Sequence, residues 1–505
     1  MRRVGGVVLT LEEGTGTLNA RSENASSSHR GLVMEQAIRQ AVDTMDGAVA
    51  YDGSAVTVKR AQAVAGPATD RLVRLAVFGA TPEAKDAARW LIWELAQIAG
   101  CRPASIQDLY AARGRGECGG FTVPAMNLRV ITYDTARAVF RALKQRKAGA
   151  FLCEIARSEM AYTDQRPAEY TSVVLAAALR EAFDGPVFIQ GDHFQVNAAK
   201  YQAGAEEELK AIRTLIAEGL AAGFFNIDID TSTLVDLAFP TLDEQQRENY
   251  TRAAELTALV RKREPRGVTT SVGGEIGEVG GKNSTVEELR AFMDGYNRSL
   301  AALGNPVGLS KISVQTGTSH GGMVLPDGSI AQVKLDLKAL RALSEEATAT
   351  YRLAGAVQHG ASTLPEDAFG NFPKFGACEI HLATNFQNMV FDHPSLPADL
   401  RAELRAWVIQ HCANERKPSD TEEQFLYKSR KKAIGPFKAA MWDLPAGIKD
   451  QVCADLEARF GFLFDQLNIG DTAGLVARHV RAPLLRHAAP RPTAEAAPDD
   501  ADAGE

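Results

Sequence analysis

Val187-Phe188-Ile189-Gln190-Gly191-Asp192-His193 is a short apolar run that ends in an acidic residue and a histidine. Two further runs end similarly, Ile312-Ser313-Val314-Gln315-Thr316-Gly317-Thr318-Ser319-His320-Gly321 and Gly355-Ala356-Val357-Gln358-His359-Gly360-Ala361-Ser362. Each run is typical of a buried strand that ends in a turn. If the strands are parallel and share one sheet, His193, His320 and His359 gather at one edge. Three imidazoles with an open fourth position are typical of a catalytic zinc site.

Two carboxylates accompany these histidines. The run Thr269-Thr270-Ser271-Val272-Gly273-Gly274-Glu275 also ends in a polar residue, and Glu275 is therefore a fourth candidate ligand. Asp192 precedes His193, where a carboxylate suits proton transfer or orientation of a metal ligand. The alternative for Asp192 is a cap of the next helix. One histidine at a strand end is more often structural, but three of the chain's nine at equivalent ends favour a shared site.

The pattern around these runs predicts a (β/α)8 TIM barrel. We expect strands near residues 120–128, 149–156, 186–192, 224–230, 268–276, 310–318, 355–361 and 377–384, with helical segments between them, such as 205–222 and 286–303. Ser284 to Glu287 form a predicted capping box before the second of these helices. Eight such units fit a barrel, which needs about 250 residues. An open doubly wound sheet is the alternative, but no GxGxxG turn follows an early strand.

The barrel is expected to occupy residues 118–395 and to be flanked on both sides. Residues 1–117 are predicted to form a small N-terminal α/β region, with a strand over 71–79 and a helix from Thr81-Pro82-Glu83 to Gly100. Residues 396–487 read as a C-terminal helical extension. Residues 488–505 are rich in Ala, Pro and Asp and are predicted to be a disordered tail.

Composition narrows the functional class. The 505-residue chain has a net charge of −7 and no long basic run, which argues against a nucleic-acid partner. Its six cysteines contain no CxxC pair, so neither a disulfide framework nor a cysteine zinc site is indicated. The sequence contains no 18-residue apolar run and no signal peptide, so we expect a cytoplasmic protein without a membrane partner.

Glycines beside the histidines indicate what the site binds. Gly321 and Gly360 follow His320 and His359, Ser362 lies in the same turn, and Thr384 ends the last predicted strand. Exposed backbone N–H groups at this end of a barrel commonly hold phosphate. The alternative is that the glycines only turn the chain. A zinc site beside a phosphate site would suit a phosphorylated carbonyl substrate.

At this point the sequence resembles the class II, zinc-dependent fructose-bisphosphate aldolase family. The similarity covers about residues 119–440, and the order, spacing and ligand types of the motifs agree. Residues 375–384 are similar to the family's final barrel strand, and Tyr427-Lys428-Ser429-Arg430-Lys431 to its C-terminal YDPRK segment. The remaining motifs are Gln190-Gly191-Asp192-His193, Asn226-Ile227-Asp228-Ile229-Asp230-Thr231-Ser232, Glu275-Ile276-Gly277, Gly317-Thr318-Ser319-His320-Gly321 and His359-Gly360-Ala361-Ser362-Thr363-Leu364-Pro365-Glu366.

The resemblance implies a lyase of carbohydrate metabolism, a glycolytic aldolase that acts on a phosphorylated sugar resembling fructose 1,6-bisphosphate, and a homodimer. Asp192 would handle the proton on the aldehyde-derived oxygen, and a Zn²⁺ cofactor would be bound by His193, His320 and His359. The ketose phosphate would be held by Gly321, Gly360, Ser362 and Thr384, and the distal phosphate by Arg430.

Three positions depart from the family pattern. Asn283 stands where the family has the mobile glutamate that removes the carbon-bound proton, and His381 and Ala383 replace the Asn and Asp of its NIDT motif. Glu278, three residues after Glu275 and just before two glycines, is the nearest carboxylate that could act as the base.

These departures leave alternatives open. One is a related aldolase or epimerase that acts on another sugar phosphate, and another is a non-catalytic partner subunit. A Schiff-base aldolase is least favoured, because Lys311 lies at the start of its predicted strand, at the opposite end from His320.

Overall fold

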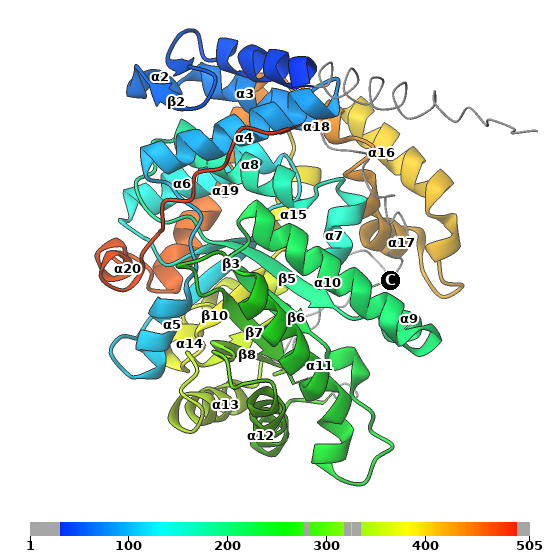
Figure 1. Ribbon diagram of the computed structural model, residues 1–505. Helices are drawn as coiled ribbons and strands as arrows, with labels where there is room; N and C mark the ends of the chain where they lie inside the picture. The colour runs from blue at the N-terminus through cyan, green and yellow to red at the C-terminus, as the bar shows by residue number, and fades with distance from the viewer. Residues whose placement is uncertain (1–30, 277–281, 318–324, 326–334, 492–505) are drawn as a thin grey trace, which may run out of the picture.

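Eight parallel strands close into a barrel at the centre of the molecule (Figure 1). The computed structural model describes residues 31–276, 282–317, 325 and 335–491. The barrel confirms the predicted fold, and each of the eight predicted strand ranges overlaps one observed strand. In the closed order β10-β3-β4-β5-β6-β7-β8-β9, the strands are β3 (Val123–Asn127), β4 (Leu152–Ala156), β5 (Ile189–Gln195), β6 (Asn226–Asp230), β7 (Ser271–Glu275), β8 (Lys311–Val314), β9 (Ala356–Gln358) and β10 (Glu379–Leu382).

Helices that follow the strands form the outer layer (Figure 1). The predicted helix over 205–222 is confirmed in full. The helices of this outer layer are α6 (Thr132–Gln145), α7 (Arg157–Tyr162), α8 (Pro167–Arg180), α9 (Ala198–Ala203), α10 (Ala205–Ala222), α11 (Leu242–Arg263), α12 (Val286–Ala302), α13 (Leu337–Ala349), α14 (Asn371–Lys374) and α15 (Thr384–Phe391).

Helix α12 begins where the sequence predicts, but its capping box lies one residue later than predicted. Thr285 Oγ1 accepts a hydrogen bond from the Glu288 N–H at 3.2 Å, and Glu288 accepts one from the Thr285 N–H at 2.8 Å. Ser284 Oγ instead accepts from the N–H of Gln315 at 2.9 Å. Ser284 therefore links the chain before α12 to the segment that follows β8.

The N-terminal region packs helices against the outer layer of the barrel. Its elements are β1 (Val49–Tyr51), β2 (Val56–Val58), α2 (Ala61–Val64), α3 (Pro67–Phe78), α4 (Pro82–Ala99) and α5 (Gln107–Gly114), and β1 and β2 pair antiparallel. The predicted strand over 71–79 is wrong, because residues 71–78 belong to α3 and Gly79 is its C-cap. Leu72, Val73, Ala76 and Val77 are buried with helical spacing, and α3 packs against α4 and α8.

The predicted C-terminal helices are present as α16 (Ala398–His411), α17 (Glu422–Ser429), α18 (Lys438–Trp442), α19 (Ala446–Gln466) and α20 (Ala473–His479). Residues 481–491 have no regular structure and run along α4 (Figure 1). There Trp93 Nε1 donates to the Leu485 carbonyl at 2.6 Å and Trp90 Nε1 to the His487 carbonyl at 3.1 Å. These bonds tie the C-terminal segment to the N-terminal region. Most of the predicted disordered tail, residues 492–505, lies outside the described residues.

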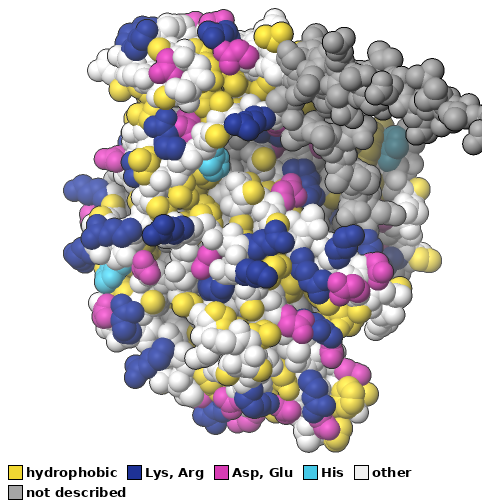
Figure 2. All heavy atoms as spheres, in the orientation of Figure 1, with side chains coloured by type: hydrophobic (Ala, Val, Ile, Leu, Met, Phe, Trp, Pro, Cys, Tyr) yellow, Lys and Arg dark blue, Asp and Glu magenta, His cyan; other side chains and the backbone are white. Residues whose placement is uncertain are grey.

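The outer surface carries both signs of charge, which are intermixed on the face shown in Figure 2. Exposed pairs such as Arg252 and Glu248 on α11, 3.2 Å apart, place opposite charges side by side. Such exposed pairs contribute little to stability. Among the helices of the described residues, none has both the length and the apolar character needed to cross a membrane.

The interior of the barrel is polar below the rim. TIM-barrel interiors are usually filled by branched apolar side chains. Here the side chains of Gln190, Asp228, Lys311 and Glu379 are buried inside the barrel. Gly273 makes room for them, because a Cβ at this position would lie 2.2 Å from Asp228 Oδ1 and 2.8 Å from Lys311 Cε. This polar layer supports the side chains at the rim above it.

Candidate metal centre and active site

A bulge in β5 brings Asp192 and His193 to the same rim. The predicted end of the strand at His193 is wrong, because β5 continues to Gln195. Between Gly191 and Phe194 its register against β6 shifts, and His193 has a φ of 40°. A bulge inserts one extra residue and re-aims side chains. Two neighbouring residues, which would face opposite sides of a regular strand, can thereby contribute to one site.

The rim brings together Asp192, His193 and His359. Each offers a ligand atom within 4.8 Å of the others, and the two imidazole centroids are 4.4 Å apart. His359 directly follows β9, as predicted. Imidazole nitrogens and a carboxylate oxygen are ligands that suit zinc. His320, the third predicted histidine ligand, lies outside the described residues.

Asp230 and Glu275 orient His193 from behind. His193 Nδ1 lies 2.8 Å from Asp230 Oδ2 and 3.3 Å from Glu275 Oε2, whereas its Nε2 lies 3.8 Å from Asp192 Oδ1. Burial opposes ionisation of Asp230, but the hydrogen bond with His193 lowers its pKa to about 2. An ionised Asp230 accepts the Nδ1 proton, which leaves Nε2 to face Asp192. This is the carboxylate–histidine arrangement found behind metal-bound imidazoles.

Glu275 was predicted to be a metal ligand. In the structure its carboxylate faces Nδ1 of His193 rather than Nε2, and together with Asp230 and His193 it forms a separate group whose ligand atoms lie within 4.8 Å. Burial raises the pKa of Glu275 to about 7, and the nearby Asp230 charge adds to the effect. Direct ligation by Glu275 therefore stays a prediction.

His381 is a further imidazole beside His359, and their ring centroids are 4.0 Å apart. His381 Nδ1 lies 3.2 Å from Asp192 Oδ1 and 3.1 Å from Glu154 Oε2. On its other side, His381 Nε2 lies 2.7 Å from Glu379 Oε1. The residue that departs from the family pattern therefore joins the rim to the polar interior.

Lys311 is the cation of that interior. Its ammonium group contacts Glu379, lies 2.9 Å from Asp228 Oδ1 and donates to Gln190 Oε1 at 2.8 Å. Burial alone would lower the pKa of Lys311, but Asp228 and Glu379 raise it above its usual value. A permanently protonated amine is not a nucleophile, which agrees with the prediction that a Schiff-base mechanism is least favoured.

Three of the predicted phosphate-binding residues lie in neighbouring turns. Gly360 has a φ of 65° and begins the 3₁₀ turn Ala361–Thr363, which contains Ser362. Ser362 Oγ accepts a hydrogen bond at 2.6 Å from the N–H of Ala383, the residue before Thr384 at the start of α15. Gly321, the fourth, lies outside the described residues.

Arg430 was predicted to bind the distal phosphate. Its guanidinium is held by α15, with contacts of 2.5 and 2.9 Å to the carboxylate of Asp392 and 2.7 Å to Asn388 Oδ1. Phosphate binding by Arg430 would therefore compete with Asp392 for the guanidinium.

The segment after β7 is described only in part. Glu278, the predicted base, lies outside the described residues. Asn283 donates from Nδ2 to Asp336 Oδ2 at 3.1 Å. Asp336 in turn caps α13, because its Oδ1 accepts from the N–H groups of Lys338 and Ala339 at 3.1 and 3.0 Å. Asn283 thus links two loops at this end of the barrel.

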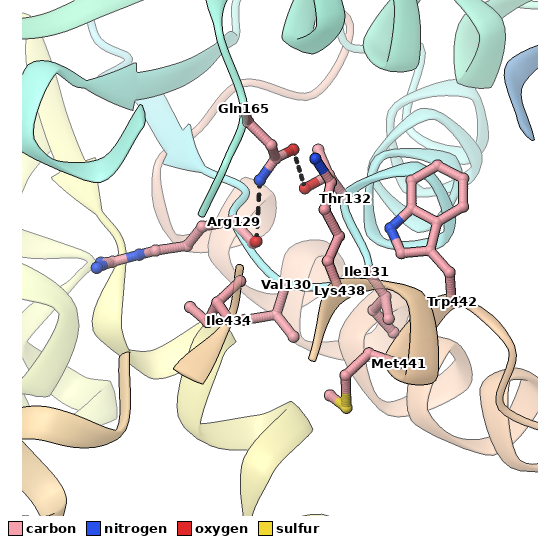
Figure 3. Close-up of a pocket in the computed structure, with 9 residues that line it drawn as sticks. All are labelled: Arg129, Val130, Ile131, Thr132, Gln165, Ile434, Lys438, Met441 and Trp442. Carbon is pink, nitrogen blue, oxygen red and sulfur yellow. Dashed lines mark hydrogen bonds between the residues drawn. The ribbon is translucent and has the colours of Figure 1, made fainter. Parts of the chain in front are cut away.

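A small pocket lies between the segment after β3 and α18 (Figure 3). Gln165 bridges its wall, donating to the Arg129 carbonyl at 3.1 Å and accepting from Thr132 Oγ1 at 2.8 Å. The Arg129 guanidinium points away from it, toward Tyr162 and Glu159. Its lining contains none of the predicted site residues, so we assign it no part in the chemistry.

Sequence reasoning missed the roles of Asp230, Glu154 and Glu379. Each is a fully buried carboxylate on a barrel strand. The available signal was a charged residue inside a short, otherwise apolar strand, because buried charges require partners. Lys311 carried the same signal, but its partners lie on other strands and could not be named from spacing.

Comparisons with known proteins bear on the fold and the family. A search of curated proteins gave no match. A probable tagatose 6 phosphate kinase from Sinorhizobium meliloti 1021 is similar in structure, with a TM-score of 0.52, 18% identity and coverage of 70% of this chain and 100% of that one. A putative fructose-1,6-biphosphate aldolase from Coccidioides immitis gives a TM-score of 0.41 at 17% identity, covering 73% and 97%. At these identities the first similarity bears on the fold alone, and the second carries no argument.

The family is established by the sequence itself. The profile of the family described as "Fructose-bisphosphate aldolase class-II" matches residues 113–442, which is more than half of the chain. The match spans all eight barrel strands and both described histidines of the rim group. The chain therefore belongs to the class II fructose-bisphosphate aldolase family.

Proposed function

We propose that the protein is a zinc-dependent aldolase that cleaves or forms a ketose phosphate resembling fructose 1,6-bisphosphate. The observation that carries the proposal is the group of Asp192, His193 and His359 at the rim, with ligand atoms within 4.8 Å of one another. The donor set fits zinc, and His320 is proposed to complete it. The same proposal includes a homodimer and a cytoplasmic location.

The residues divide the chemistry between them. A zinc ion in this position would polarise the ketose carbonyl and stabilise the negative charge that develops during cleavage. His193 and His359 would hold it, and each ring has a partner that fixes its orientation: Asp230 Oδ2 lies 2.8 Å from His193 Nδ1, and Ser313 Oγ lies 2.9 Å from His359 Nε2. Asp192 would move the proton at the aldehyde-derived oxygen.

Substrate phosphate is proposed to bind at the adjoining turns. Gly360, Ser362 and Thr384 would hold the ketose phosphate together with Gly321, and the hydrogen bond between Ser362 and Ala383 keeps the two turns together. Backbone N–H groups at such turns favour an anion. Arg430 is proposed to bind the distal phosphate, which would replace Asp392 as the partner of its guanidinium group.

The first test is metal-dependent cleavage. Retro-aldol assays on fructose 1,6-bisphosphate and related ketose phosphates, with and without chelator, should show activity that chelation abolishes. Metal analysis of His359→Ala and His320→Ala should show loss of zinc, and undiminished zinc in both variants would reject the assignment. Asp192→Asn should lower kcat by roughly 10²–10⁴-fold while zinc at His193 and His359 remains, as expected of a general acid–base residue.

The enolisation base is tested separately by tritium release from labelled dihydroxyacetone phosphate. We expect wild-type protein to exchange the label and Glu278→Gln to lose exchange with zinc still bound. Equal exchange in both proteins would reject Glu278 as the base. Exchange that appears only in Asn283→Glu would indicate a different natural substrate, or a chain without aldolase activity.

A second candidate is an aldolase or epimerase that acts on a different sugar phosphate. His381 supports it, because an imidazole 3.2 Å from Asp192 stands where the family has an asparagine. Ala383 also removes the family's aspartate from the start of α15. Product analysis by NMR over a panel of ketose phosphates distinguishes cleavage from epimerisation. A zinc-loaded protein that changes no member of the panel would favour the non-catalytic partner subunit.

A further inference from the structure

A buried arginine lies at the end of β4, close to the rim group. Arg129 follows β3, and the residue is 8% exposed. Its guanidinium extends away from the small pocket (Figure 3), and its Nη1 lies 3.1 Å from Glu159 Oε1. The other oxygen of Glu159 accepts a hydrogen bond from the N–H of Ala156 at 2.8 Å. Because Ala156 of β4 is in register with Asp192 of β5, Arg129 is placed near the residue proposed to move a proton.

Arg129 and Asp192 also interact electrostatically. Burial works against the charge of Arg129, but Glu159, Tyr162 and, more weakly, Asp192 raise its pKa above the usual value. Arginine is protonated at physiological pH in any case, so this shift changes no charge. It does show that the guanidinium lies within electrostatic range of the Asp192 carboxylate.

One edge of this guanidinium is used and the other is not. Nη1 donates to the Tyr162 hydroxyl at 2.6 Å and contacts Glu159. Among the described residues, Nε has no hydrogen-bond partner, and no hydrogen bond or ion pair involves Nη2. The Nε–H and Nη2–H bonds of an arginine run parallel and suit the two oxygens of a carboxylate or a phosphate. Glu159 therefore balances the charge of Arg129 but leaves this bidentate edge without an acceptor.

The surrounding contacts hold the guanidinium in place. The backbone carbonyl of Arg129 accepts from Gln165 Nε2 at 3.1 Å. Tyr162 is held in turn, because its carbonyl accepts from the N–H of Gly435 at 2.9 Å and the Lys431 ammonium lies 5.6 Å from the centre of its ring. A donor pair fixed in this way loses little conformational freedom when it binds an anion. The free edge is thus preorganised for a ligand.

We infer that Arg129 binds the anionic group of the aldehyde half of the substrate, a phosphate or a carboxylate, through Nε and Nη2. The inference rests on the proposed aldolase function, in which Asp192 acts at the aldehyde-derived oxygen. A neutral aldehyde would leave the buried edge of Arg129 without an acceptor, which is unfavourable. Arg129 therefore selects an acidic aldehyde against a neutral one, because a site built to pair with a charged group disfavours a ligand that lacks it.

The test compares acceptor aldehydes of different charge in aldol addition to dihydroxyacetone phosphate, catalysed by the full-length, zinc-loaded protein. The acceptors are glyceraldehyde 3-phosphate, the carboxylate tartronate semialdehyde and neutral glyceraldehyde. In wild type, kcat/KM should favour one of the two anions over glyceraldehyde, and that acceptor identifies the anionic group. Arg129→Gln should lower this preference by roughly 10–100-fold, as expected when hydrogen bonds to a charged group are lost. Arg129→Lys keeps the charge without the parallel donors and should also lower it.

The matched control is Arg261→Gln. The side chain of Arg261 is also 8% exposed and pairs with Glu264 at 2.7 Å, but it donates to the Val307 carbonyl in the loop before β8, at the opposite end of the barrel. This variant should keep the wild-type preference, and thermal unfolding checks that all variants are folded. A wild type without preference for an anion overturns the inference, as does a preference that both Arg129 variants keep. Loss of the preference in Arg430→Gln alone has the same meaning, since Arg430 would then bind the anion.

Binding without turnover separates this inference from the proposed function. Isothermal titration calorimetry with glycerol 3-phosphate and with glycerate, in excess dihydroxyacetone phosphate, measures the anion site directly. Suppose that wild type adds no aldehyde. Binding of one probe that weakens by roughly 10–100-fold in Arg129→Gln would then support the anion site and reject the aldolase. Equal affinities in the two proteins, or no binding to wild type, would reject both.

Discussion

Replacing Asp230 by asparagine tests whether the orientation of His193 controls metal binding. Asp230 Oδ2 contacts His193 Nδ1 at 2.8 Å and accepts from Gln195 Nε2 at 2.6 Å. Oδ1 accepts from the Ser232 N–H at 3.0 Å and from its hydroxyl at 2.6 Å. All of these partners donate to the carboxylate. Asparagine has the same shape, but one of its two positions is an NH₂ donor.

Neither orientation of the amide satisfies these partners. With NH₂ at the Oδ2 position, it faces Gln195 and drives the proton of His193 from Nδ1 to Nε2, the nitrogen that faces Asp192. With NH₂ at the Oδ1 position, it faces the N–H of Ser232. A buried donor left without an acceptor costs about 1–3 kcal/mol. The loss of such an orienting carboxylate lowers metal affinity by roughly 10–100-fold.

Competition titration with a chromophoric chelator measures this affinity. We expect the dissociation constant of the zinc site to rise by roughly 10–100-fold in Asp230→Asn. Ser232→Ala is the matched control, because it removes one bond to Oδ1 and leaves the His193 contact in place. It should change affinity by less than about 3-fold, since one hydrogen bond to a charged group contributes about 1.5–3 kcal/mol to the protein and only a small part of that reaches the metal. Equal affinities of Asp230→Asn and wild type would refute the role assigned to Asp230.

Three further predictions concern stability, each measured by chemical or thermal unfolding of metal-stripped protein. Lys311→Met leaves buried carboxylates uncompensated and should lower the free energy of unfolding by about 3–5 kcal/mol. Arg298→Met, the control, breaks an exposed ion pair and should change it by about 0–1 kcal/mol. Equal losses of stability in the two variants would contradict the buried network. Gly273→Ala places a Cβ 2.2 Å from Asp228 Oδ1 and should lower the free energy of unfolding by about 1–3 kcal/mol. Gly119→Ala, the control, has no atom within 4 Å of the new Cβ and should leave stability nearly unchanged. A Gly273→Ala variant as stable as wild type would contradict the tight packing at this position. Burial raises the pKa of Glu275 from 4.5 to about 7. As the pH rises from 4.5 to 7, the stability of wild type should therefore fall relative to that of Glu275→Gln, by at most about 3 kcal/mol. Parallel pH profiles of stability in the two proteins would exclude this pKa shift.

Local patterns predicted the framework of the fold and two members of the rim group. All eight strand ranges were readable, because each strand is a short apolar run bounded by turn residues. His359 follows β9 as predicted, and His193 lies two residues before the end of β5, near the rim where parallel strands of a barrel bring their ends together. The last part of α3, residues 71–78, was misread as a strand, since its buried face is covered by α4 and α8 and most of its residues are apolar.

Contacts between strands could not be predicted in the same way. The bulge at His193 depends on the register of β5 against β6, which a single strand does not encode. The contacts of His381 with Asp192 and Glu154, and of Lys311 with Asp228 and Glu379, join residues on different strands. The distances between these residues are set by closure and shear of the barrel.

The sequence by itself therefore determined the barrel, its family and the positions of His193 and His359 near the rim, because these depend on patterns within single strands and on short motifs. Only the tertiary structure decided which nitrogen of His193 faces Asp192, that Glu275 lies behind that ring, and that a charged interior underlies the site. The physical reason is that hydrogen bonds and ion pairs act over about 3 Å, and such distances between distant parts of the chain exist only once the strands have closed around a common axis.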